Sequence, residues 1–253
     1  MSAFLGKSCS WIAGAATVGL MLAVSSHARA GEKIYSPIVE EGEWEVESRT
    51  LFGTDSDPTV NGAQNHVFEI GYGPTSYWAT SLLVEVERDP GKPAQATHFA
   101  WENIFQLTPQ GKYWLDAGAY VELEKGLNGH PDEVETKLLL EKEIYNWVTT
   151  VNLIFNKNLN GNEGRGVNFN YDWRVEYRFH PMFELGLEGY GELGELRNFL
   201  PPSEQYQTIG PAILGRIPFG PGHLRYDIAY LRGLTTATPS SSFQANLEYE
   251  FRF

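Results

Sequence analysis

Cysteine is nearly missing from this chain: Cys9 is the only cysteine among 253 residues. It lies in an N-terminal segment that we expect to be removed, so the remaining chain would hold no thiol. Disulfides, thiolate metal sites and cysteine nucleophiles are therefore excluded for that part of the sequence.

Long apolar runs are lacking as well. The longest, from Trp11 to Val24, is shorter than the ~20 residues of a membrane-spanning helix, and later stretches of that length all carry charges. A helical membrane protein is therefore excluded. The run follows Lys7 and precedes Ala28-Arg29-Ala30, which is the order of a secretory signal peptide and its cleavage site. We expect residues 1–30 to be cleaved and residues 31–253 to form one domain.

Basic residues are scarce: 19 Lys and Arg stand against 32 Asp and Glu, for a net charge of −13. A chain this acidic repels phosphates, which excludes nucleic acid as a partner. Helical periodicity is nearly absent too. Aromatic residues, by contrast, make up 13% of the chain, and 26 glycines and 14 prolines accompany them. This composition is typical of many short strands joined by tight turns.

What the sequence has in abundance is alternation of apolar and polar residues with a period of two, the signature of β-strands. From Val167 to Phe179, seven apolar or aromatic residues alternate with six polar or charged ones, and the stretch from Phe243 to Phe253 repeats the pattern. One face of such a strand is too bulky, and the other too charged, for an ordinary soluble core.

The alternation predicts twelve strands, at residues 43–51, 63–72, 76–87, 97–107, 112–123, 134–143, 147–156, 167–179, 183–193, 206–217, 223–232 and 242–253. Their connections are predicted to alternate in length without exception. The tight ones are Gly73–Thr75, Thr108–Gly111, Glu143–Asn146, His180–Met182 and Phe219–Gly222, and the long ones are 52–62, 88–96, 124–133, 157–166, 194–205 and 233–241.

An even number of strands with short periplasmic turns and longer extracellular loops is what a bacterial outer-membrane barrel requires. Hydrocarbon offers no partner to backbone N–H and C=O groups, so only a helix or a closed sheet can cross it. The predicted fold class is therefore all-β: a transmembrane, antiparallel, up-and-down β-barrel of about 12 strands. Outer-membrane lipid would surround it.

A soluble periplasmic barrel or sandwich is the alternative, because periodicity alone does not say which parity faces outward. Apolar side chains on the outside would decide for the membrane. Within the tenth predicted strand, Pro211 lacks a backbone donor and predicts a bulge or a shifted boundary. The first strand has only Trp44 and Val46 as convincing lipid-facing residues. Aromatic residues at strand ends are candidates for interfacial girdles: Trp44, Tyr72, Trp78, Tyr113, Trp147, Phe179, Phe183 and Tyr249.

The closing signature Leu247-x-Tyr249-x-Phe251-x-Phe253 resembles the C-terminal strand of Gram-negative outer-membrane proteins. That resemblance implies recognition by the barrel-assembly machinery through the strand ending at Phe253. Trp147 with its alternating strand, Ile209-Gly210-Pro211-Ala212 and Leu247–Phe251 resemble the transporter-type phenol-degradation pathway family of outer-membrane barrels. This second resemblance implies a barrel that takes up small organic compounds, and it supplies no catalytic residues.

If the apolar parity faces lipid, charged side chains of the other parity line the lumen. The candidates are Glu69, Glu85, His98, Glu102, Asp116, Glu122, Asp172, Arg174, Glu176, Arg178, Glu184, Glu188, Arg225 and Asp227. Most are expected to pair across neighbouring strands, with Arg174 and Arg178 in reach of Glu184 and Glu188. Alternatively, the excess of carboxylates makes a cation-preferring pore.

Enzymatic and metal chemistry find little support. No histidine has a serine partner in a recognisable motif, so no catalytic residue is assigned. Two predicted loops contain clustered acidic residues, Asp55-Ser56-Asp57 and His130–Glu133, but neither has the spacing of a calcium-binding loop. No metal or cofactor is expected. The sequence therefore predicts a channel or transporter for small solutes, with a plugged structural or enzymatic barrel as the alternative. It leaves the solute and the oligomeric state open.

Overall fold

The computed structural model describes residues 32–160 and 166–253. The expected signal peptide, residues 1–30, lies outside these residues. Within the described ranges, no helix has the length and apolar character needed to cross a membrane.

In the same ranges, twelve long strands and one two-residue strand form a single antiparallel sheet. The strands are β1 (Trp44–Thr54), β2 (Gln64–Thr75), β3 (Trp78–Arg88), β4 (Gln95–Gln106), β5 (Asp116–Gly126), β6 (Glu133–Ile144), β7 (Trp147–Asn158), β8 (Asn168–His180), β9 (Phe183–Glu195), β10 (Asn198–Phe199), β11 (Tyr206–Phe219), β12 (Gly222–Gly233) and β13 (Ser241–Phe251).

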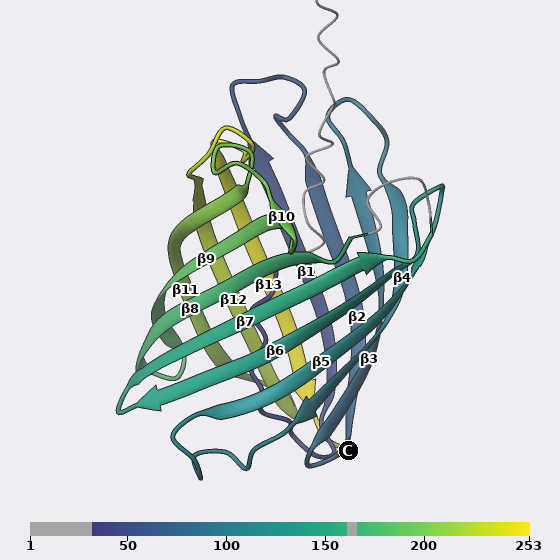
Figure 1. Ribbon diagram of the computed structural model, residues 1–253. Coiled ribbons are helices and arrows are strands. Elements are labelled where there is room, and N and C mark those ends of the chain that lie inside the picture. Colours follow the sequence, from purple (N-terminus) through teal and green to yellow (C-terminus); the bar gives the residue numbers. More distant parts are fainter. Residues whose placement is uncertain (1–31, 161–165) are drawn as a thin grey trace, which may run out of the picture.

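The sheet closes into a barrel because the first and last strands pair. Trp44 lies opposite Phe251 and Thr54 opposite Ser241, so β1 and β13 are joined along their whole length. Every other long strand pairs with the long strand before it and the long strand after it in the chain. The short strand β10 pairs only with the end of β9. The result is the up-and-down barrel of Figure 1, which leaves none of the twelve long strands as an edge.

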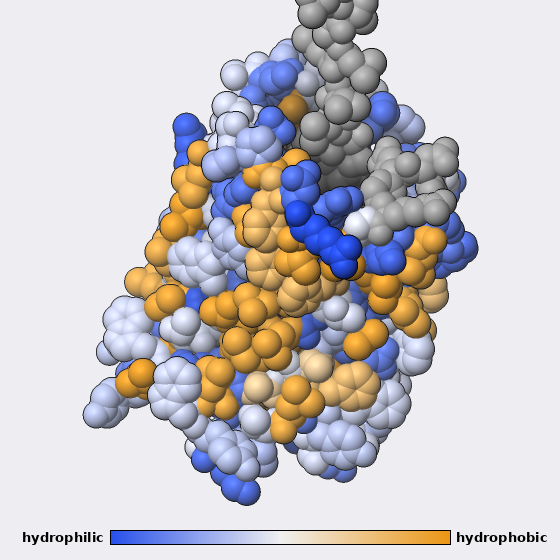
Figure 2. Space-filling model, viewed as in Figure 1, coloured by the Kyte–Doolittle hydropathy of each residue, from blue (hydrophilic) through white to orange (hydrophobic). Residues whose placement is uncertain are grey.

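Apolar side chains face outward and ionic ones inward. Phe179 and Leu185 are about half exposed, at 49% and 50%, whereas Glu85 and Glu188 on the other parity are at 2% and 0%. Figure 2 shows the consequence on one face: an orange apolar zone covers the strands, and blue polar residues gather at the loops. This orientation confirms the predicted transmembrane barrel and is the reverse of a soluble sandwich, whose apolar side chains would fill the interior.

The connections separate the two ends of the barrel. Long connections, 55–63, 89–94, 127–132, 196–205 and 234–240, lie at what we call the long-loop end, as do residues 159–160 and 166–167 between β7 and β8. The other end, the short-turn end, has two-residue turns at 76–77, 145–146, 181–182 and 220–221. It also holds the connection 107–115, so the predicted strict alternation of lengths is wrong at this one place.

Local hydrogen bonds explain why 107–115 is a loop and not a tight turn at Thr108–Gly111. The backbone N–H of Ala117 donates to the Thr108 hydroxyl, and that of Gly111 donates to the Asp116 carboxylate, at 2.9 and 2.8 Å. Gly111 has a φ of +66°, a left-handed conformation that glycine adopts without strain. The polar backbone groups are thus satisfied inside the loop, and β5 begins at Asp116 instead of residue 112.

Pro211 sits inside β11 without the bulge that its missing donor predicts. The pairing of β11 with β9 runs in one register from Tyr206 to Leu214, and Ile209 and Ala212 keep a common register with β12. Neighbouring Gly210 makes this possible, because a Cβ there would lie 1.8 Å from the Tyr230 carbonyl oxygen. Proline is therefore accommodated by a close approach of two backbones, without an extra residue.

Two glycines on the outer face of β9 are covered by aromatic rings of β8. Gly189 lies opposite Trp173, and Gly191 lies opposite Tyr171. A Cβ at either glycine would meet the partner ring at 2.5 or 2.4 Å. Rings seated on glycines in this way restore the packing that a strand glycine otherwise lacks.

Aromatic side chains gather at the short-turn end, as the girdle prediction implies. The rings of Trp44 and Tyr72 lie 4.7 Å apart, and those of Phe179 and Phe183 lie 5.6 Å apart. Trp147 pairs with Tyr177 in the same way, at 4.9 Å. Amphipathic rings at this height suit the boundary between hydrocarbon and headgroups.

Candidate functional site

The interior of the barrel holds a segment that precedes β1. Residues 32–39 run inside the ring of strands, and residues 40–43 connect them to β1 as part of the purple chain in Figure 1. At the short-turn end the Gly42 N–H donates to the Gly73 carbonyl at 2.7 Å, and farther in the Asn246 side chain donates to the Glu32 carbonyl at 3.3 Å. We call residues 32–39 the inner segment.

Tyr35 anchors the inner segment at the middle of the barrel. Its hydroxyl accepts a hydrogen bond from Arg49 and donates one to Glu102, both at 2.8 Å. Its backbone N–H and carbonyl are both bonded to the side-chain amide of Asn152, at 2.8 and 2.9 Å. Strands β1, β4 and β7 thus hold one tyrosine, and we call these four residues the Tyr35 cluster.

Further contacts make the Tyr35 cluster a packed barrier. The ring of Tyr120 lies 4.8 Å from that of Tyr35, and the Lys137 ammonium lies 4.2 Å from the Tyr35 ring centroid. Glu69 pairs with Arg49 at 3.0 Å, so the guanidinium is neutralised by more than one carboxylate. Buried charges survive at low cost only when they are paired in this way.

A cavity of about 400 Å³ lies at the long-loop end, above the Tyr35 cluster. Carboxylates dominate its wall: eleven Asp and Glu among its described residues stand against Lys33, Arg49 and Lys137. Glu122 and Glu135 even lie directly opposite each other on β5 and β6. We call it the acidic vestibule.

A second cavity, of about 430 Å³, lies at the short-turn end. Its charges are nearly balanced, with five basic residues and seven acidic ones among those described. Arg174 is the centre of this balance, with Glu176 and Asp227 at 3.0 Å and Glu188 at 3.2 Å. We call this space the paired vestibule.

The structure places eleven of the fourteen lumen candidates on the walls of the two cavities. Those that line the acidic vestibule are Glu85, His98, Glu102, Glu122 and Asp172. Those that line the paired vestibule are Arg174, Glu176, Arg178, Glu184, Arg225 and Asp227.

The remaining three candidates have local partners. Glu69 belongs with Arg49, and Glu188 accepts hydrogen bonds from Arg174 and from the Tyr190 hydroxyl. Asp116 accepts a hydrogen bond from the backbone of the 107–115 loop. The ladder expected between β8 and β9 is present, since Arg174 reaches Glu188 and Arg178 lies 3.8 Å from Glu184.

Sequence reasoning missed the inner segment, which it assigned to no element. Ile34, Tyr35 and Val39 are buried, and Ile34 joins an apolar patch inside the barrel that includes Leu214 and Leu231. The run Ile34–Val39 is too apolar for a solvated leader, and that was the available signal. Glu124 and His130, which line the acidic vestibule, were also missed.

The rim of the long-loop end is held by Asp55. Its carboxylate accepts hydrogen bonds from the backbone and the hydroxyl of Ser240, both at 2.7 Å, and so joins the loop 55–63 to the loop 234–240. The backbone N–H of Asp57, followed by Ser240, lowers the pKa of Asp55 to about 2. Asp55 therefore has protein partners, like Asp132, whose pKa is lowered by the Lys125 ammonium.

Solved structures of several porins are similar to this fold. The NanC porin matches with a TM-score of 0.54 and 11% identity, over 82% of this chain and all of that one. The KdgM porin matches with a TM-score of 0.52 and 10% identity, over 82% and 99%. A KdgM structure in complex with disordered oligogalacturonate gives 0.51 and 9%, over 83% and 99%.

Neither a family model nor a curated protein matches the chain. The resemblance to the phenol-degradation pathway family therefore stays a prediction. At identities this low, the likeness to the porins concerns the fold alone. This chain has the fold of these porins: a closed, antiparallel, twelve-stranded β-barrel.

Proposed function

We propose that this barrel lies in the outer membrane of a Gram-negative bacterium and conducts small solutes. The observation that carries the proposal is the lumen itself, which holds a charged cavity at each end, with the inner segment and the strand side chains that bind Tyr35 between them. Side chains alone fill the interior of a barrel of about eight strands, whereas a barrel of twelve is wider and leaves space that a solute can occupy. Lipid contacts its apolar face, and the exposed C-terminal Phe253 is the contact for the barrel-assembly machinery.

The solute class follows from charge. Carboxylates along a constriction attract cations and repel anions, so the acidic vestibule favours cationic or neutral solutes. The KdgM porin, by contrast, was solved in complex with oligogalacturonate, a chain of carboxylates. Such a polyanion would be repelled by the acidic vestibule, which makes it an unsuitable solute for this barrel.

The apolar patch inside the barrel narrows the class further. Ile34, Tyr190 and Leu231 belong to a cluster of buried apolar side chains on the inner wall. Displacement of the inner segment, which carries Ile34, would uncover this patch, and an organic cation could then place its charge among carboxylates and its carbon atoms against the patch. We therefore propose small organic cations as preferred solutes over inorganic ones.

Conduction requires the inner segment to yield. Tyr35 is held by hydrogen bonds from three strands, and the two vestibules meet only at the inner segment, whose Lys33 lines both. We propose that displacement of residues 32–39 opens the path, with the Tyr35 cluster as the closed state.

Single-channel recording in planar bilayers tests this proposal. The refolded protein, shown to be folded by heat-modifiable gel mobility, should give brief cation-selective openings. Choline or a similar organic cation should carry current or reduce the potassium current. Absence of any conductance from the folded barrel, with the inner segment present and with it deleted, would remove the channel and leave a plugged structural barrel.

A surface hydrolase is the second candidate, because one array on the outer face has the required types of group. The Thr50 hydroxyl lies 3.1 Å from His66 Nδ1, and His66 Nε2 lies 3.3 Å from the Gln64 side-chain oxygen. A nucleophile, a base and an orienting group follow that order. Ester hydrolysis in mixed micelles that disappears in Thr50→Val would support it, and equal activity in both proteins would exclude it.

A further inference from the structure

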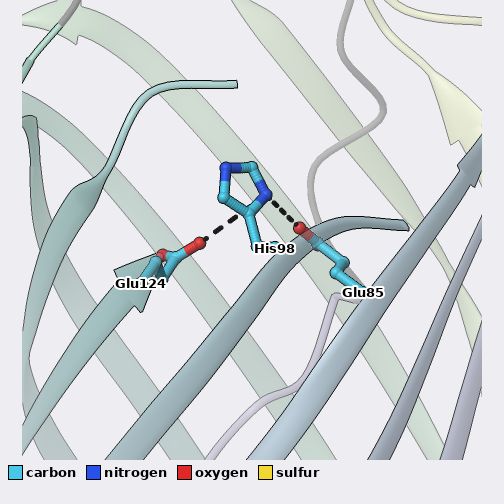
Figure 3. Close-up of side chains that lie close together, drawn as sticks. All are labelled: Glu85, His98 and Glu124. Atoms are coloured by element: carbon cyan, nitrogen blue, oxygen red, sulfur yellow. Dashed lines mark hydrogen bonds and ion pairs between the residues drawn. The ribbon is translucent and has the colours of Figure 1, made fainter. Parts of the chain in front are cut away.

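Three strands bring metal-ligating side chains together in the acidic vestibule. Glu85 of β3, His98 of β4 and Glu124 of β5 point toward one another in Figure 3. His98 Nδ1 lies 2.8 Å from a Glu85 carboxylate oxygen and 3.9 Å from one of Glu124. One ligand atom from each residue lies within 4.8 Å of the other two.

These distances suit a transition-metal ion. Nitrogen and oxygen ligands bind zinc at 2.0–2.2 Å, so neighbouring ligand atoms stand about 3.0–3.5 Å apart. The His98 contacts bracket that spacing. A small rotation of the Glu124 side chain, which is 13% exposed, would bring all three atoms onto one ion.

A β-bulge presents His98 to the site. The register of β3 against β4 shifts between Glu85 and Val86, where His98 and Ala96 are the partners. Such a bulge turns successive side chains to the same face. Thr97 and His98 accordingly both contact the Glu85 carboxylate, at 3.2 and 2.8 Å.

Thr97 and Asn65 also orient Glu85. The Thr97 hydroxyl donates to the same Glu85 oxygen that contacts His98, and the Asn65 amide reaches the other oxygen at 3.4 Å. Hydrogen bonds of this kind fix the direction of a ligand before the metal arrives and strengthen its binding.

A second histidine approaches from the loop 127–132. The rings of His98 and His130 lie 5.4 Å apart, centroid to centroid. The loop can fold this close because Gly126 pairs with His98 and has no side chain: a Cβ there would lie 2.0 Å from the His130 carbonyl oxygen. The His130 ring thus packs against the ring of His98 at the edge of the cluster.

The charge of the cluster calls for a cation. The ion pairs of Glu85 and Glu124 in the described chain are both with His98, whereas Lys125 points outward to Asp132. Two carboxylates around one imidazole leave a negative excess, which the acidic vestibule reinforces. Mixed imidazole and carboxylate ligands suit zinc, nickel, copper or iron better than calcium or magnesium.

We propose that Glu85, His98 and Glu124, with the His130 ring packed beside them, form a binding site for one divalent transition-metal ion at the long-loop entrance of the lumen. The site faces the cavity, and its three ligands come from β3, β4 and β5, outside the inner segment. Its binding of metal is therefore independent of whether the barrel conducts.

Zinc titration of the folded protein in detergent micelles tests the proposal, using competition with a chromophoric chelator. The wild type should bind one zinc ion per chain, with calcium in excess unable to displace it. His98→Gln and Glu124→Gln should each weaken binding by roughly tenfold or more, since even loss of an outer partner costs 10–100-fold.

Two matched variants separate coordination from general attraction. Glu87→Gln removes a carboxylate from the same vestibule but from outside the cluster, and His180→Gln removes an exposed histidine at the short-turn end. Both should keep zinc affinity within a few-fold of the wild type. Equal losses in Glu87→Gln and Glu124→Gln, or wild-type affinity in His98→Gln, would overturn the site, provided that heat-modifiable mobility shows each variant folded.

Discussion

The two vestibules of one lumen solve the problem of enclosed charge in opposite ways. In the paired vestibule, Arg174 is surrounded by Glu176, Glu188 and Asp227, so most carboxylates have a guanidinium partner. In the acidic vestibule, three basic side chains face eleven carboxylates among the described residues. Pairing of opposite charges offsets the cost of burying them in the folded barrel, whereas an uncompensated excess of carboxylates attracts mobile cations. The short-turn half thus has the character of a scaffold, and the long-loop half that of a site.

Deleting residues 32–39 should erase the boundary between the two halves and give the largest effect. Loss of the inner segment joins the two cavities, so single-channel conductance should rise several-fold while cation preference persists. Planar bilayer recording measures both quantities. Tyr113→Ala, which removes an exposed ring from the 107–115 loop at the end where the segment enters, is the control and should leave conductance unchanged. Unchanged conductance after the deletion would mean that the segment does not obstruct the path.

Arg174→Met should show how strongly the stability of the barrel depends on the central cation of the paired vestibule. Glu188, at 0% exposure, would lose its only basic partner among the described residues, and Glu176, at 2%, would keep only Arg178. Breaking a buried pair in this way costs about 3–5 kcal/mol of unfolding free energy. Urea titration of the folded fraction in lipid vesicles measures it.

Arg216→Met is the matched control for that comparison. Arg216 also pairs with a carboxylate, Glu250, at 2.7 Å, but its side chain is 46% exposed. Solvent-exposed pairs contribute less than about 1 kcal/mol. Equal destabilisation by the two variants would contradict the view that burial makes the Arg174 network structural.

Glu122→Gln should sharpen the contrast in selectivity. A unit charge about 4 Å from a permeating cation is worth about 1 kcal/mol in water, or a factor of about five in local concentration. The ratio of cation to anion permeability, taken from the reversal potential in a salt gradient, should fall accordingly. Glu184→Gln in the paired vestibule should change it less, because Arg178 and Arg225 share that cavity. A larger effect from Glu184→Gln would reverse the assignment of the two halves.

The smallest effect concerns the rim above the acidic vestibule. Because the folded pKa of Asp55 is lowered to about 2, its contribution to the loop contact is complete above the ordinary pKa near 4. The contribution is lost as pH falls through 2, when the carboxylate is protonated. The Ser240 amide signal should therefore stay nearly constant down to about pH 3 and shift with a midpoint near pH 2. A midpoint near pH 4 would show that the contact does not form in solution.

The sequence predicts the wall of this barrel well because alternation is a local signal. The expected strand 167–179 is β8 (Asn168–His180), and the strand at 183–193 is the start of β9. Within each strand, the alternation of apolar and polar residues alone indicates which side chains face lipid. The same alternation brought Glu85 and His98 onto the lumen side of the sheet.

The contents of the lumen are less predictable, since they depend on contacts between distant parts of the chain. Residues 32–39 show no alternation, and their place follows from contacts with strands far along the sequence, such as the bonds of Tyr35 to Glu102 and Asn152. The bulge at Thr97 and the fold of the loop over Gly126 decide where His98 and His130 meet, and neither has a period to detect. Pro211 failed as a bulge signal because Gly210 beside it already admits the neighbouring strand.

The glycines beneath the rings of Trp173 and Tyr171 have a consequence for how strands find their partners. The alternation of apolar and polar side chains prevents a strand from shifting by one residue against its neighbour, because that shift would turn its apolar side chains inward. It does not prevent a shift of two residues, which keeps every apolar side chain on the outside. A ring that fits only over a bare backbone position removes that degeneracy. Sliding β8 by two in one direction would drive Trp173 against Leu187, and the opposite slide would drive Tyr171 against Leu193. The two contacts, Trp173 on Gly189 and Tyr171 on Gly191, therefore select one register between β8 and β9.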